Sequence, residues 1–206
     1  MNKPSILVCA IVSVFITYSS AQEKVKSYTA VSKNETPNYA EFSNDGKYIA
    51  AGVYGAVRVW EINSKEFTDF KTNLKNETPH FVHFSPDGEH IAAGVWGAVR
   101  VWKISSGEFT DYVTKRNNET PAFVGFSPDG KFMAAGVYGA VRVWNINTGK
   151  PMDYPTPLKN ETPRFVMFSP DGRYIVAGTY GEVRLWKIAE SPDEHLESRS
   201  EVKISF

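Results

Sequence analysis

The chain contains a single cysteine in 206 residues, and this residue, Cys9, lies in a segment that we expect to be removed. Residues 1–21 have the pattern of a secretory signal peptide: a positive start at Lys3, an apolar stretch over residues 6–18, and small residues up to Ala21. Cleavage after Ala21 would leave a mature chain without thiols. We therefore predict a secreted protein whose stability comes from core packing rather than from disulfides.

An excess of charge and a second long apolar run are also missing. The 23 Lys and Arg residues balance the 23 Asp and Glu residues, so the formal net charge is zero. No basic stripe favours nucleic acid as a partner. The apolar stretch of the signal is shorter than the roughly 20 residues of a membrane helix. We therefore expect no membrane span after signal cleavage.

Signatures of catalysis and metal binding are absent too. The chain has no Gly-x-Ser-x-Gly, no His-Glu-x-x-His and no phosphate-cradling glycine loop. His80 and His83 are three positions apart on an expected strand, so their side chains should point to opposite faces. The sequence predicts no enzyme, no catalytic residue, no cofactor and no metal site.

A repeat of 42 residues dominates what is present. The motif Tyr54-Gly-Ala-Val-Arg-Val-Trp60 recurs with its final tryptophan at Trp102, Trp144 and Trp186. A fixed period of roughly 20 to 50 residues indicates a solenoid, a propeller or an array. The motif Asn-Glu-Thr-Pro keeps the same step, at Asn34, Asn76, Asn118 and Asn160.

Each unit shows strand signals separated by short turns. In the first unit they cover residues 39–42, 48–53 and 57–62, and spaced aromatics at Phe67 and Phe70 mark a fourth strand. Ser-Pro-Asp-Gly turns, or the variant at residues 43–46, follow the first strand. Four strands per unit without helical periodicity predict an all-β β-propeller with four-stranded antiparallel blades, four per chain, over residues 22–188.

These motifs, in fixed order, resemble the WD40-type β-propeller repeat. The family's Trp-Asp ending appears as Trp60-Glu61, and its Gly-His before the first strand is replaced by Asn-Glu-Thr-Pro. The repeats are therefore divergent members of that pattern. The resemblance implies a module that binds a protein partner.

The two ends of the repeat region raise the question of closure. The last unit has no fourth strand of its own, and residues 189–206 are interpreted as a disordered tail. The N-terminal strand Val25–Val31 is predicted to complete the last blade, because closure hides unpaired strand edges. A closed four-bladed monomer and an eight-bladed homodimer with exchanged N-terminal strands are both compatible with the sequence.

Candidate binding residues come from the turn before the third strand and from the Asn-Glu-Thr-Pro loop, which should lie on one face. The turn supplies the aromatic residues Tyr54, Trp96, Tyr138 and Tyr180, and the loop supplies Glu35, Glu77, Glu119 and Glu161. Exposed aromatics on a rigid scaffold suit a partner's apolar side chain or a sugar ring. The alternative is that these residues pack against neighbouring blades.

Two further residues, an arginine and an asparagine, recur at a fixed position of each unit. The arginines Arg58, Arg100, Arg142 and Arg184 either pair locally, with Asp69, Asp111 and Asp153 for the first three, or form a ring of anion contacts. Asn34, Asn76, Asn118 and Asn160 each precede Glu-Thr, the N-glycosylation pattern, or are turn-forming residues.

The sequence therefore predicts a secreted, non-enzymatic β-propeller that acts as a protein-binding or scaffold module. The alternative function is a multivalent lectin-like binder of small ligands or sugars.

Overall fold

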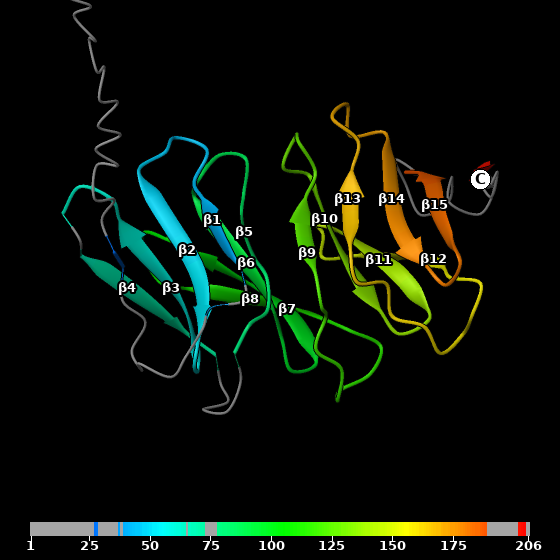
Figure 1. Cartoon of the computed structure of the whole chain (residues 1–206), viewed down its shortest axis with the longest axis horizontal. Coiled ribbons are helices and arrows are strands. Elements are labelled where there is room, and N and C mark those ends of the chain that lie inside the picture. The colour runs from blue at the N-terminus through cyan, green and yellow to red at the C-terminus, as the bar shows by residue number, and fades with distance from the viewer. Residues whose placement is uncertain are drawn as a thin grey trace, which may run out of the picture.

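The computed structural model describes residues 27–28, 37, 39–64, 66–72, 78–188 and 202–204. Within them the fold is all-β, with four separate sheets of four antiparallel strands each (Figure 1). Blade 1 consists of β1 (Ala40–Phe42), β2 (Tyr48–Val53), β3 (Ala56–Glu61) and β4 (Phe67–Lys71). Blade 2 consists of β5 (Val82–Phe84), β6 (His90–Val95), β7 (Ala98–Lys103) and β8 (Phe109–Val113). Blade 3 consists of β9 (Val124–Phe126), β10 (Phe132–Val137), β11 (Ala140–Asn145) and β12 (Pro151–Pro155). Blade 4 consists of β13 (Val166–Phe168), β14 (Tyr174–Thr179), β15 (Glu182–Lys187) and β16 (Val202–Ile204). The predicted fold class, a propeller with four blades per chain, is confirmed.

The core lies between the blades, where the facing sides of neighbouring sheets pack against each other. We call the face that a blade turns toward the next blade its back face, and the other its front face. Ala50, Val57 and Val59 on the back face of blade 1 pack against Ile91 and Trp102 on the front face of blade 2. Blades 2 and 3 and blades 3 and 4 repeat this arrangement. Burial on both faces explains why β2 and β3 are almost continuously apolar.

The four blades form an open arc. β1 packs on β5, β5 on β9 and β9 on β13, whereas no comparable contact joins β13 to β1 among the described residues. Figure 1 shows blade 1 on the left and blade 4 on the right of the row. Val183 on the back face of blade 4 is 42% exposed, although the equivalent Val57, Val99 and Val141 are fully buried. Over the described residues, the four blades therefore do not close into a ring.

Blade 4 corrects two predictions about the chain ends. Its outer strand is β16, which pairs with β15 through Ile204 opposite Val183, Lys203 opposite Arg184 and Val202 opposite Leu185. The prediction that Val25–Val31 completes the last blade is not met at Tyr28, which packs on Trp60 of blade 1, and the other residues of that segment except Ser27 lie outside the described residues. A disordered tail over residues 189–206 is wrong for residues 202–204, whose strand satisfies the open edge of β15.

The predicted signal segment, residues 1–21, and most of the predicted tail lie outside the described residues. Among the residues that the structure does describe, none forms a helix with the length and apolar character of a membrane span.

Candidate functional site

The turns between the second and third strands and the Asn-Glu-Thr-Pro loops meet on one face of the arc, here called the loop face. The Gly97 amide in the turn of blade 2 donates to the Glu119 carbonyl at 2.7 Å, and the Gly139 amide in blade 3 donates to the Glu161 carbonyl at 2.6 Å. The predicted common face is thereby confirmed for these residues. Glu35 and Glu77 lie outside the described residues.

The Glu119 carboxylate connects two blades. Its Oε1 accepts a hydrogen bond from the Tyr138 amide in the turn of blade 3, while its backbone carbonyl holds the turn of blade 2. Burial raises the pKa of Glu119, and the Tyr138 amide and the nearby Arg116 charge oppose that rise. The other oxygen, Oε2, is buried and has no hydrogen-bond partner among the described residues. Glu119 therefore has a structural role, which the sequence pattern did not reveal.

The four turn aromatics are not equivalent. Tyr54 and Trp96 are each 56% exposed and Tyr180 is 77% exposed, whereas Tyr138 is half-buried. The Arg116 guanidinium carbon lies 3.2 Å from the centre of the Tyr138 ring. Packing within the chain accounts for Tyr138, and the three other turns present apolar surface to solvent.

A cluster of aromatic rings, here called the central aromatic cluster, lies at the beginning of the inner strands. Its members are Tyr39, Phe81, Phe123 and Phe165, which precede β1, β5, β9 and β13 by one residue. Neighbouring ring centres are 5.1, 5.2 and 6.1 Å apart, and Phe81 also contacts Phe165 at 5.9 Å. The cluster was not predicted as a site, although the aromatic at this position in all four units was a usable signal.

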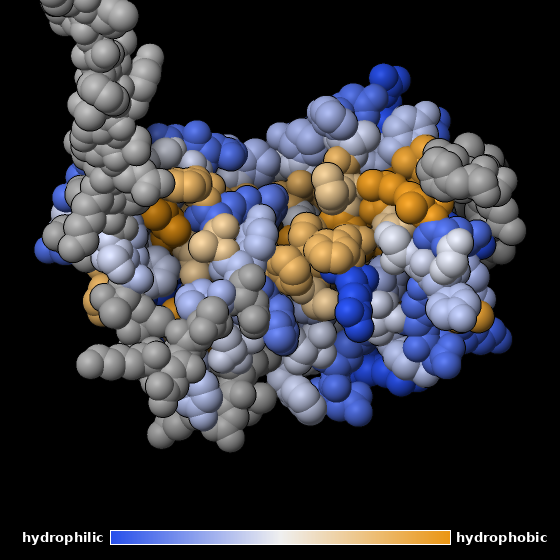
Figure 2. Space-filling model, in the orientation of Figure 1, coloured by the Kyte–Doolittle hydropathy of each residue, from blue (hydrophilic) through white to orange (hydrophobic). Residues whose placement is uncertain are grey.

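This cluster belongs to the loop face. Ala40 pairs with Ala51 near the end of β2, so the start of β1 lies beside the turn that carries Tyr54. Phe165 is 58% exposed. Figure 2 shows a broad apolar area over β9, β13 and β14 in this orientation. Exposed apolar surface of this kind on a rigid scaffold marks a contact site for a partner or a ligand.

Three of the repeated arginines form two-point ion pairs with the neighbouring strand. The Arg58 Nε lies 2.6 Å from Asp69 Oδ1, and its Nη2 donates to Oδ2 at 2.8 Å. The same geometry recurs in Arg100 with Asp111 and in Arg142 with Asp153. The arginine side chains are at most 8% exposed. The hypothesis of local pairing is confirmed for these three, while Arg184 instead pairs with Glu182 on its own strand.

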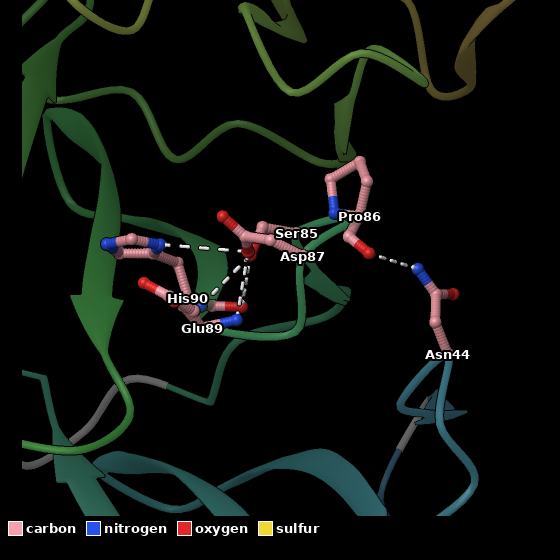
Figure 3. A network of polar contacts seen from close by, with 6 residues as sticks. All are labelled: Asn44, Ser85, Pro86, Asp87, Glu89 and His90. Atoms are coloured by element: carbon pink, nitrogen blue, oxygen red, sulfur yellow. Dashed lines mark hydrogen bonds and ion pairs between the residues drawn. The ribbon is translucent and has the colours of Figure 1, made fainter.

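The Ser-Pro-Asp-Gly turn of blade 2 contains a group with the spacing of metal ligands. Ligand atoms of Asp87, Glu89 and His90 lie within 4.8 Å of one another, and no other such group occurs in the described part of the chain. Figure 3 shows that the Asp87 carboxylate already accepts hydrogen bonds from Ser85 Oγ and from the Glu89 amide at 2.9 Å. The same Ser–Asp bond recurs in the other three blades without a histidine. The group is therefore explained as a turn network.

The structure describes two of the four asparagines in the glycosylation pattern. Asn118 and Asn160 are both exposed on the loop face, and Asn34 and Asn76 lie outside the described residues. Exposure satisfies one requirement for modification of Asn118 and Asn160 but is equally suited to turn-forming residues.

Two grooves lie between blades on the face opposite to the loop face. A groove of about 650 Å³ between blades 1 and 2 is lined by Glu66, Phe67 and Lys103, and one of about 390 Å³ between blades 2 and 3 is lined by Glu108, Phe109 and Asn147. Neither groove contains a predicted binding residue.

Comparison with known proteins agrees with this architecture. The family model described as WD domain, G-beta repeat, matches residues 75–103, 121–145 and 162–187, which lie in blades 2, 3 and 4. No curated protein matches the chain. A solved structure of Kuenenia stuttgartiensis hydrazine synthase is similar with a TM-score of 0.62 and 20% identity, over 78% of this chain and 49% of that chain. This chain thus spans about half of that one, and the likeness concerns the fold alone. In total 1160 solved chains match, so the fold by itself narrows the function very little.

Proposed function

We propose that this chain, whose blades 2, 3 and 4 match the WD-repeat family model, is a secreted, non-enzymatic module that binds a protein partner on its loop face. Propellers of this type serve as interaction scaffolds. We choose the loop face because it contains the central aromatic cluster and the exposed turn aromatics. Aromatic anchors supply most of the binding energy at protein interfaces.

The opposite face lacks a comparable combination in the described residues. Two of its exposed aromatics, Phe67 and Phe109, lie against the guanidinium groups of Arg58 and Arg100, whose carbons are 3.8 and 3.9 Å from the ring centres. These rings therefore cover buried ion pairs of their own chain. Trp96 and Tyr180, by contrast, project from turns and have most of their surface in solvent.

In the test, this protein and two variants of it are used as baits, and the proteins that each bait captures from the extracellular fluid are compared. The double variant Trp96→Ala/Tyr180→Ala removes exposed side chains, so its folding should be unchanged, and Phe109→Ala is the control on the opposite face. We expect a protein from the extracellular fluid that binds the wild type and the control and loses at least about tenfold in affinity for the double variant. If every captured protein binds all three baits equally, the loop face is not the binding surface.

A second candidate function is a lectin-like binder of sugars, favoured by the exposure of Trp96 beside Gly97, which makes a flat stacking platform. Tyr138 is covered by Arg116, so fewer than four equivalent sites would be available. A glycan array combined with titration separates the two functions. Several sugars per chain favour the lectin, and one macromolecule per assembly favours the protein-binding module.

Secretion and glycosylation are part of the same proposal. The protein recovered from the medium should begin at Gln22. Treatment with a glycosidase should increase its gel mobility if Asn118 and Asn160 carry glycans. An unprocessed N-terminus would contradict secretion through this signal, and unchanged mobility would leave Asn118 and Asn160 as turn residues.

A further inference from the structure

Each of the three junctions between blades has the same set of contacts. The strand glycine of one blade faces the proline carbonyl that leads into the next: a Cβ built on Gly52, Gly94 or Gly136 would lie 1.8, 2.1 or 1.9 Å from the carbonyl oxygen of Pro79, Pro121 or Pro163. An outer-strand aromatic of one blade meets the third-strand tryptophan of the next, in the pairs Phe70–Trp102, Tyr112–Trp144 and Tyr154–Trp186. These contacts define what a complete junction contains.

The back face of blade 4 lacks its half of such a junction. A Cβ on Gly178, the equivalent of Gly136, would meet nothing within 4 Å. Gly181 is likewise open, whereas the equivalent Gly97 and Gly139 face loop carbonyls. Together with the 42% exposure of Val183, this leaves a sheet face shaped for a neighbouring blade but without one.

The front face of blade 1 is open at its inner strand β1, whereas Ala51, Val53 and Trp60 on β2 and β3 are buried. Phe42 is 63% exposed, although the equivalent Phe84 and Phe126 are 3% and 7% exposed. Val82 at the start of β5 is buried, whereas Ala40 at the equivalent position of β1 is exposed. Blade 1 therefore lacks a neighbour over its inner strand, where blades 2 and 3 are each covered by the blade before them.

Tyr28 marks where the missing blade would lie. Its ring is 6.3 Å from Trp60, and its hydroxyl donates to the Ile62 carbonyl at 3.1 Å. Tyr112 makes the same two contacts, 6.3 Å to Trp144 and 3.1 Å to the Ile146 carbonyl, and Tyr112 belongs to the outer strand of the preceding blade. Residues 27–28 thus occupy the outer-strand position of a blade that precedes blade 1.

We propose that blade 4 of a second copy of this chain occupies that position, so that two open arcs form one eight-bladed ring with two-fold symmetry. The blade 4 of the same chain is at the other end of the arc, and the two open faces are the complementary halves of one repeated junction. In the ring, Tyr28 lies opposite Val183 of the partner subunit and Ser27 opposite Arg184 of the partner subunit, as Tyr112 and Asp111 lie opposite Val99 and Arg100.

The exchanged strand takes the edge that β16 holds in the single chain. β16 pairs with β15 over three residues, whereas the outer strands β4, β8 and β12 pair over five. A five-residue ladder like that of β4, β8 and β12, together with the contact between Tyr28 and Trp60, would favour the exchanged strand over β16. Exchange of identical elements between protomers is a low-cost route to a dimer.

The first test is the mass of the mature protein in solution, measured by light scattering and sedimentation. The proposal predicts two chain masses. A single chain mass at micromolar concentration would overturn it, whether that chain is open or closed.

The second test is Gly178→Ala. In the single chain the added methyl group points into open space, but in the ring it meets the carbonyl of Pro37 of the partner subunit, the counterpart of Pro79, Pro121 and Pro163 one repeat earlier. We expect dissociation at least about thirtyfold easier, because the clash occurs at both junctions, with an unchanged circular dichroism spectrum. The control Gly125→Ala, whose Cβ would meet its nearest atom at 3.4 Å, should remain a dimer. A Gly178→Ala protein that dimerises as tightly as the wild type would show that another surface makes the dimer.

A third measurement identifies the exchanged strand. Ser27→Cys in one chain and Arg184→Cys in a co-expressed, differently tagged chain would place two thiols on directly opposite residues, roughly 4.5–5.5 Å apart between Cα atoms and within reach of a disulfide. The proposal predicts a disulfide that joins the two tags. Failure of this pair to oxidise, in a protein that is dimeric, would contradict the strand exchange.

Discussion

Gly136→Ala should be strongly destabilising because of one contact between blades 3 and 4. An added Cβ would lie 1.9 Å from the Pro163 carbonyl oxygen and 2.9 Å from the carbonyl carbon. Both are backbone atoms, so no side chain can rotate to make room. The loop must move away, which strains the hydrogen bond between the Gly139 amide and the Glu161 carbonyl. Overpacking of a core costs about 1–3 kcal/mol, and a lost hydrogen bond adds about 1 kcal/mol.

We therefore expect a loss of roughly 2–4 kcal/mol in the free energy of unfolding, which lowers Tm by roughly 5–15 °C in a chain of this size. Urea denaturation and calorimetry measure both quantities. The matched control is Gly125→Ala in the same blade, where the nearest atom to the new Cβ is 3.4 Å away and belongs to the Phe123 side chain. A Gly136→Ala protein as stable as this control would refute the account of how blades are joined.

Three other predictions concern the charged groups and the loop face. Asp153→Asn leaves the buried Arg142 without its carboxylate and should cost roughly 1.5–3 kcal/mol in chemical denaturation, while Glu66→Gln at an exposed position should change little. Hydrogen bonds from Ser43 and Ser169 lower the pKa values of Asp45 and Asp171 to about 2, and the Arg142 and Lys115 contacts outweigh burial to lower the pKa of Asp153. Because these pKa values lie below the unfolded value of about 3.9, stability from these groups is complete above that pH and is lost as the pH falls toward 2, which a series of Tm measurements will follow. Glu119→Gln should raise Tm at pH 7 and not at pH 3, because burial raises the pKa of Glu119 and an amide keeps the acceptor for the Tyr138 amide without the charge.

The repeat made most of the fold predictable. Four copies of one pattern show which residues are equivalent, and the turns at Ser-Pro-Asp-Gly and Tyr-Gly fix the strand boundaries to within about a residue. The pairing of Arg58 with Asp69 was also predictable, because strand alternation and the step between columns place them side by side. Arg184 was expected to differ for the same reason, and it does.

Other features depend on contacts between units, and the repeat pattern does not show which of these contacts form. The role of Glu119 arises from the way its loop bridges two turns, and the difference between Tyr138 and Trp96 follows from Arg116, a residue found in one loop only. The choice of β16 as the outer strand of blade 4 depends on the curvature of the arc. Inter-blade curvature is a sum of many small packing effects and leaves no motif in the sequence.

A crystal structure of the mature protein tests the central claim most directly, through the surroundings of Gly178. The account predicts two chains in one ring, with the Pro37 carbonyl of the partner subunit against Gly178 and the partner's Tyr28 strand along β15. Gly178 open to solvent, or covered by Pro37 of its own chain, would contradict it.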